Sequence, residues 1–157
     1  MKICLIYVRT SRQPWFERAL EDYLGKINRF CSFEILPVAS DSSARNERNR
    51  KIKKEEVKLL SLLKETDLVL AFDERGRSFA HSRDFSAFLV KKMEMGKTRI
   101  VFIIGGAFGL GEEIKNRAHD LLSLSSLTMN HQVATIVSVE QIYRAFTIWK
   151  GTAYHND

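Results

Sequence analysis

Three glycines, Gly105, Gly106 and Gly109, lie within five positions and follow directly on the apolar run of residues 98–104. The run is rich in β-branched side chains, which favours a buried strand. Glycines at the end of a strand let the backbone turn sharply or approach a bound molecule, and ligands of α/β proteins bind at such strand ends. The junction therefore predicts a ligand site. A tight turn that binds nothing would have the same signature.

A dinucleotide is the usual ligand of a glycine turn between a strand and a helix. Here the spacing is GGxxG instead of GxGxxG, and Ser125 and Ser126 stand about 20 residues further on, where an acidic residue would bind the ribose. Glu112 and Glu113 fall in the first turn of the next expected helix, where they would repel a phosphate. The sequence therefore favours a neutral or cationic nucleoside ligand.

Strand and helix patterns alternate along the chain, which is typical of a mostly parallel sheet flanked by helices. The length of 157 residues and the 45% hydrophobic content suit a single α/β domain over residues 1–157. Strands are expected at residues 1–8, 32–38, 67–72 and 98–104. Loops are expected at residues 41–49 and 73–77.

Helices are expected between these strands. The first opens at Pro14, the second carries Ile52, Val57, Leu60 and Leu63 on its apolar face, and the third runs from Phe85 to Met93. A short helix follows Gly111, and a long one covers residues 131–148.

The long C-terminal helix is apolar on more than one face, which exceeds what one side of a small sheet needs. We infer a homodimer interface, with complete burial in the monomer core as the alternative. Glu140 and Arg144 are spaced to form an ion pair.

The net charge of +6 and the pI near 9.4 favour a polyanionic partner, and RNA is the natural candidate. The excess is concentrated in residues 45–58, which hold seven Lys or Arg against three Glu. A solvated helix face is the alternative interpretation of this run.

Neither a membrane segment nor a metal site is expected. The first eight residues have the pattern of a strand and lack a signal-peptide cleavage site, and no apolar run approaches the ~18 residues of a membrane span. The four His and two Cys show no metal-ligand spacing. We therefore expect a cytoplasmic protein.

Several motifs occur in a characteristic order. They are Ile104-Gly105-Gly106 with Gly109-Leu110, then Leu124-Ser125-Ser126-Leu127-Thr128, His131, Glu140-Gln141-Ile142-Tyr143-Arg144-Ala145-Phe146 and Tyr154-His155. This order resembles the small SPOUT-class ribosomal methyltransferases. The resemblance is greatest to the family that methylates N3 of a pseudouridine in 23S (large-subunit) rRNA, and it covers nearly the whole chain.

The resemblance implies an α/β fold with a C-terminal trefoil knot, a homodimer, and S-adenosylmethionine bound in the knot largely by backbone groups. It also implies that the substrate is rRNA in assembled ribosomes or large subunits. By position, the cofactor-binding residues are Phe72, Gly105, Leu124, Ser125, Ser126, Leu127, Thr128 and Met129.

The resemblance also assigns the catalytic residues. Methylation at N3 requires loss of an imino proton, which a histidine can accept at neutral pH, and this makes His155 the candidate base. Tyr154 would position or stack on the target base. We call the C-terminal segment that carries Tyr154 and His155 the tail. In the family the tail completes the site at the dimer interface, so a protein without substrate is expected to show an incomplete site.

Three positions depart from the family pattern. Thr135 replaces the usual arginine, Asn156 a basic residue, and Asn130 the proline before His131. The two lost charges would weaken contacts with rRNA or with a deprotonated base. A catalytically impaired ribosome-binding module is therefore an alternative function, and a nucleotide-cofactor enzyme of ordinary doubly wound topology is a third.

Overall fold

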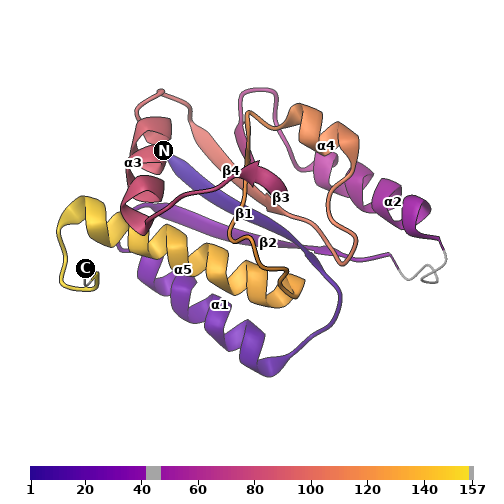
Figure 1. Ribbon diagram of the computed structural model, residues 1–157, viewed down its shortest axis with the longest axis horizontal. Coiled ribbons are helices and arrows are strands. Elements are labelled where there is room, and N and C mark those ends of the chain that lie inside the picture. Colours follow the sequence, from indigo (N-terminus) through magenta and orange to yellow (C-terminus); the bar gives the residue numbers. More distant parts are fainter. Residues whose placement is uncertain (42–46, 156–157) are drawn as a thin grey trace.

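The computed structural model describes residues 1–41 and 47–155 (Figure 1). The strands are β1 (Lys2–Arg9), β2 (Ser32–Ala39), β3 (Leu68–Arg77), β4 (Arg99–Ile104) and β5 (Asp120–Leu122). The helices are α1 (Pro14–Ile27), α2 (Arg48–Ser61), α3 (Ser82–Met93), α4 (Glu112–Arg117) and α5 (His131–Lys150). Most of the expected loop at 41–49, with Arg45, lies outside the described residues, as does Asn156.

The five strands are all parallel and lie in the order β2-β1-β4-β3-β5. β1 and β4 are buried on both faces, which explains why their sequences are continuous apolar runs without alternation. The expected α/β architecture with a parallel sheet flanked by helices is confirmed.

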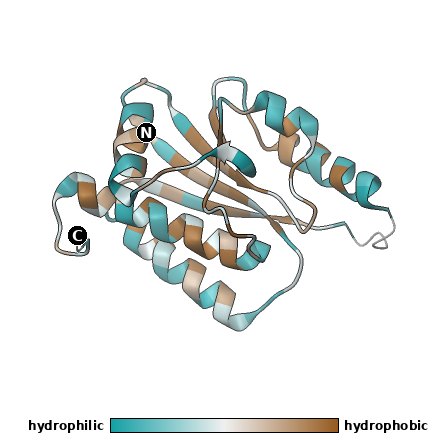
Figure 2. Ribbon diagram, viewed as in Figure 1, coloured by the Kyte–Doolittle hydropathy of each residue, from teal (hydrophilic) through white to brown (hydrophobic). Residues whose placement is uncertain are grey.

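Helices cover both faces of the sheet (Figure 1). Ile3 and Leu5 of β1 belong to the core shared with α1, α3 and α5, whereas Cys4 and Ile6 face the core shared with α2 and α4. Figure 2 shows the strands as mostly hydrophobic and the helices as striped, as expected for helices that bury one face.

α5 packs against both α1 and α3, next to the sheet. Its residues Val139, Ile142 and Phe146 are at most 1% exposed, and the Ser86 hydroxyl of α3 donates a hydrogen bond of 2.7 Å to the Ala145 carbonyl. Burial in the monomer therefore accounts for much of the apolar surface of this helix. The homodimer stays a prediction.

The apolar face expected for α2 is wrong at Val57, which is exposed, and at Leu63, which lies beyond the end of the helix at Ser61, and it omits two buried residues. Val57 is 58% exposed, whereas Glu55 and Glu56 are each only 3% exposed. Burial of a carboxylate requires hydrogen-bond partners. Glu55 accepts a hydrogen bond of 2.8 Å from the Ser40 hydroxyl, and Glu56 accepts one of 3.2 Å from the backbone N–H of Ile114 in α4.

The loop expected at residues 73–77 is also wrong, because β3 continues through it to Arg77. β5 pairs with both halves of β3: Leu122 lies opposite Phe72 and again opposite Arg77, across a register shift. A Cβ placed on Gly76 would lie 2.5 Å from the Leu122 nitrogen, so only glycine fits this passage. The trefoil knot stays a prediction with which this close passage is compatible.

No helix in the described part of the chain is long and apolar enough to cross a membrane. Within residues 1–41 and 47–155, no group of three or more His, Cys, Asp or Glu side chains is arranged to hold a metal ion.

We predict that Gly76→Ala destabilises the protein by about 3 kcal/mol or more, because the added methyl meets backbone atoms that no rotamer change can move. Urea unfolding measures the effect. Gly25→Ala is the matched control, since a Cβ there meets nothing within 4 Å in α1, and it should stabilise by up to about 1 kcal/mol. Equal stability of the two variants would contradict the proposed constraint.

Candidate functional site

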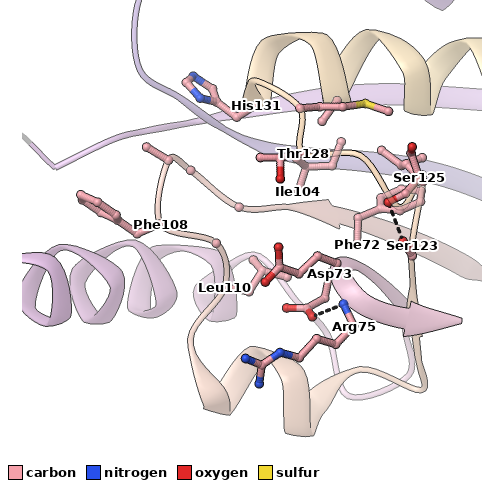
Figure 3. Close-up of a pocket in the computed structure, with 18 of the residues that line it drawn as sticks. Phe72, Asp73, Arg75, Ile104, Phe108, Leu110, Ser123, Ser125, Thr128 and His131 are labelled. Carbon is pink, nitrogen blue, oxygen red and sulfur yellow. Dashed lines mark hydrogen bonds between the residues drawn. The ribbon is translucent and has the colours of Figure 1, made fainter.

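A cavity of about 500 Å³ opens at the carboxyl ends of β3 and β4 (Figure 3). Its walls come from the end of β3, the glycine junction after β4, the segment after β5 and the start of α5. This is the edge of a parallel sheet where ligands usually bind, and the volume suits a small molecule.

Seven of the eight predicted cofactor-binding residues line this cavity. They are Phe72, Gly105, Leu124, Ser125, Leu127, Thr128 and Met129. Ser126, the eighth, is exposed and is not part of the lining. The structure thus brings together residues from three separate segments, and their role in cofactor binding stays a prediction.

The glycine junction is shaped by its own backbone. Gly109 has φ of 80°, its N–H donates a hydrogen bond of 3.0 Å to the Gly106 carbonyl, and a Cβ on Gly105 would lie 2.7 Å from the Gly109 carbonyl carbon. The turn alone therefore requires glycine at positions 105 and 109. Because the same turn forms a cavity wall, the two interpretations of the junction are compatible.

Carboxylates occupy the places where a phosphate would bind. Glu56 lies at the amino end of α4 and accepts the Ile114 N–H, and a Cβ on Gly111 would lie 2.0 Å from its Oε2 atom. Glu55 lies behind the glycine junction, 2.9 Å from the position of a Cβ on Gly106. This arrangement supports the expectation of a neutral or cationic ligand.

Asp73 is a cavity residue that the sequence reasoning missed. Burial acts to raise the pKa of its carboxyl, but hydrogen bonds from the Arg75 N–H at 2.9 Å and from the Lys115 ammonium at 3.1 Å outweigh burial and lower it. Asp73 is therefore ionised at neutral pH. The available signal was an acid placed directly after an apolar strand.

The segment that follows β5 is held by its own serines (Figure 3). The Ser123 hydroxyl donates to the Ser125 carbonyl at 3.1 Å, and the Ser125 hydroxyl accepts from the Leu127 N–H at 3.0 Å. Both serines line the cavity, and the Ser125 hydroxyl, which accepts within the loop, can still donate to a ligand. Leu127 is 76% exposed.

His131, the first residue of α5, lines the cavity and its Nε2 atom contacts the Thr10 hydroxyl at 2.5 Å. Burial lowers the pKa of His131, Glu55 opposes this shift, and Lys51 adds to it. The imidazole is therefore neutral at pH 7.

Two of the three departures from the family pattern have a local structural role. Asn130 caps α5, because its side-chain oxygen accepts a hydrogen bond of 2.8 Å from the Gln132 N–H. Thr135 is 1% exposed and donates a hydrogen bond of 2.7 Å to the His131 carbonyl.

The predicted catalytic residues lie away from the cavity. Tyr154 donates a hydrogen bond of 3.2 Å to Glu140, and His155 lies 3.2 Å from Arg144, which is itself paired with Glu140 as expected. Ala134 of the cavity wall is separated from Arg144 by about 15 Å along α5, at about 1.5 Å per residue. A single chain therefore does not bring the tail to the cavity.

We predict that His131 makes the folded protein less stable as the pH falls. Since burial depresses its pKa in the folded state, the unfolded state binds the proton more readily, and the free energy of unfolding drops as the pH falls from about 7.5 to about 5.5. Urea unfolding of His131→Gln should show a smaller drop. His119, whose pKa burial also lowers, acts in the same direction, so His119→Gln is the companion variant. An unchanged pH dependence in His131→Gln would contradict the prediction.

Comparison with known proteins places the chain in a family. The family described as "Predicted SPOUT methyltransferase" matches residues 1–155. A protein of Bdellovibrio bacteriovorus named "Ribosomal RNA large subunit methyltransferase H" is 41% identical over 156 residues, which cover 99% of each protein. The protein of the same name from Streptococcus uberis is 38% identical over 159 residues, again 99% of each.

Solved structures share the fold at low sequence identity. A probable methylase family protein from Haemophilus influenzae has a TM-score of 0.55 and 14% identity to this chain. The aligned region covers 99% of this chain and 70% of that protein. A probable methyltransferase from Bordetella pertussis has a TM-score of 0.55 and 11% identity. Its aligned region covers 92% of this chain and 95% of that protein. Because the family match includes every strand, the glycine junction and the cavity, this chain belongs to the SPOUT methyltransferase family.

Proposed function

We propose that this protein transfers a methyl group to N3 of a pseudouridine in 23S rRNA, acting in the cytoplasm on assembled ribosomes. The observation that carries the proposal is the cavity built from the glycine junction and the segment after β5, in a chain that is 41% identical to a relative named for large-subunit rRNA methylation.

S-adenosylmethionine is the cofactor that follows from membership of the family. The residues fit it: Phe72 and Ile104 offer apolar surface, residues 124–129 offer backbone groups, and ionised Asp73 offers a partner for a cation. Its sulfonium supplies an activated methyl group, so the protein needs mainly to position the target nitrogen.

The chain must also remove the imino proton from N3. His155 is the proposed base and Tyr154 the residue that positions or stacks on the target nucleotide. Since about 15 Å of helix separates the tail's contacts on α5 from the cavity of the same chain, we assign this role to the tail of a second copy in a homodimer.

A catalytically impaired ribosome-binding module is the second candidate. The observation that favours it is Thr135, a buried uncharged residue at a position where the family pattern has arginine. Such a module would bind ribosomes in a salt-dependent way without methyl transfer.

Methyl transfer from labelled S-adenosylmethionine to ribosomes that lack the modification tests the proposed function. We expect label on N3 of a pseudouridine, identified by nuclease digestion and mass spectrometry. Label on another nucleoside would keep the methyltransferase and reject the proposed target. Binding of cofactor and ribosome with no incorporation would favour the impaired module.

His155→Ala should lower the single-turnover rate by about 100-fold, because general base catalysis contributes about that much or more. A bulky substitution at the exposed cavity residue Thr128, Thr128→Trp, should block cofactor binding instead. Calorimetry should show cofactor binding by His155→Ala and none by Thr128→Trp, with normal circular dichroism for both.

Mixing these two variants tests whether the tail acts on the partner's cavity. Randomly mixed dimers should recover roughly a quarter of the wild-type rate, because half of them are mixed and each of those holds one complete site. If the mixture stays as inactive as its components, the tail does not act between chains.

A further inference from the structure

Most cations on α2 have a partner in the fold. Arg50 pairs with Glu47 at 3.3 Å, Lys53 with Glu56 at 3.3 Å and with Glu113, Lys54 with Asp41 at 3.2 Å, and Lys58 donates to the Ala39 carbonyl at 3.1 Å. These residues belong to the basic run of residues 45–58. Their charges are therefore largely balanced within the monomer.

Arg48 and Lys51 are different. Within the ranges that the structure describes, neither contacts a carboxylate, and both lie instead against one aromatic ring. The Arg48 guanidinium is 5.5 Å and the Lys51 ammonium 5.7 Å from the centre of the Phe108 ring. We call these three residues the Phe108 cluster.

The Phe108 cluster lies at the rim of the cavity. Phe108 projects from the glycine junction towards α2 (Figure 3), and both Phe108 and Arg48 contribute to the cavity lining. Arg48 is exposed and Lys51 half-buried, so the cluster is open to solvent.

The chemistry of the cluster fits a phosphate. A ring face attracts cations, but it leaves their N–H groups without acceptors, and two like charges gathered on one ring repel each other. A phosphodiester supplies both missing features, since its charge is negative and its oxygens accept several charge-assisted hydrogen bonds. Phosphate contacts fix the register of a nucleic acid on a protein.

We propose that the Phe108 cluster binds a backbone phosphate of the RNA substrate and thereby holds the target nucleotide over the cavity. This inference rests on the proposed function, because it names the part of the same site that receives the RNA.

The test compares two double variants that remove the same charge from the same helix. Arg48→Gln with Lys51→Gln dismantles the Phe108 cluster, and Arg50→Gln with Lys54→Gln removes two cations that are already ion-paired. Fluorescence anisotropy measures the binding of each variant to a labelled uridine-rich RNA oligonucleotide over a range of KCl concentrations. The same measurement is made with purified large ribosomal subunits. Calorimetry measures S-adenosylmethionine binding.

We expect the cluster variant to lose about tenfold in RNA affinity or more and to reduce the slope of log Kd against log salt by about one. The control should lose about threefold or less, and both should bind the cofactor as the wild type does. Phe108→Leu should weaken RNA binding to an intermediate degree, because it keeps apolar bulk but no ring face for the cations.

Equal losses of RNA affinity in the two double variants would overturn the proposal, because the net charge of the helix would then account for the binding. Loss of cofactor affinity in the cluster variant would also overturn it and would assign these cations to the cofactor's carboxylate. Absence of salt-dependent RNA binding by the wild type would also overturn it. If the wild type binds RNA as expected but methylates none, the proposed function fails while the role of the cluster stands.

Discussion

The passage of the Leu122 backbone against Gly76 is the constraint on which the site depends. It fixes β5 beside both halves of β3, so the cavity wall from β3 and the serine-rich segment after β5 keep one relative position. The segment after β5 is neither a helix nor a strand, and without this anchor it would be expected to be a mobile loop. The shape of the cavity therefore depends on this close approach of the β3 and β5 backbones.

Two buried glutamates support the opposite side of the site. Glu55 and Glu56 come from consecutive positions of α2, yet one lies behind the glycine junction and the other at the start of α4. Their desolvation is offset by hydrogen bonds from a hydroxyl and a backbone N–H. They lie behind the cavity lining, to which α2 itself contributes Arg48. The lining itself is mixed in charge, since Asp73 and Glu74 lie beside Arg48, Arg75 and Lys115.

Local patterns were sufficient for most of the fold. A continuous apolar run located the first strand, helical spacing located the helix that opens at Pro14, and a long apolar pattern located the helix from His131. These patterns missed the strand at residues 73–77, whose charged residues and Gly76 have low strand propensity and pair only because β5 arrives from 45 residues further along the chain. They also missed the buried acids of α2, which need partners from distant segments. The cofactor segments came from family resemblance, and no local pattern could place the tail relative to the cavity, since that depends on a second chain.

The position of α5 has a consequence for synthesis. A nascent chain that has reached Ile104 contains four of the five strands and can pair β2, β1, β4 and β3, but the sheet face between α1 and α3 lies open until residues 131–150 have left the ribosome. His131 and Ala134 of the cavity wall arrive with the same helix. The apolar face is therefore exposed to the translating ribosome and to chaperones up to that point, and an unfinished chain cannot assemble the cavity.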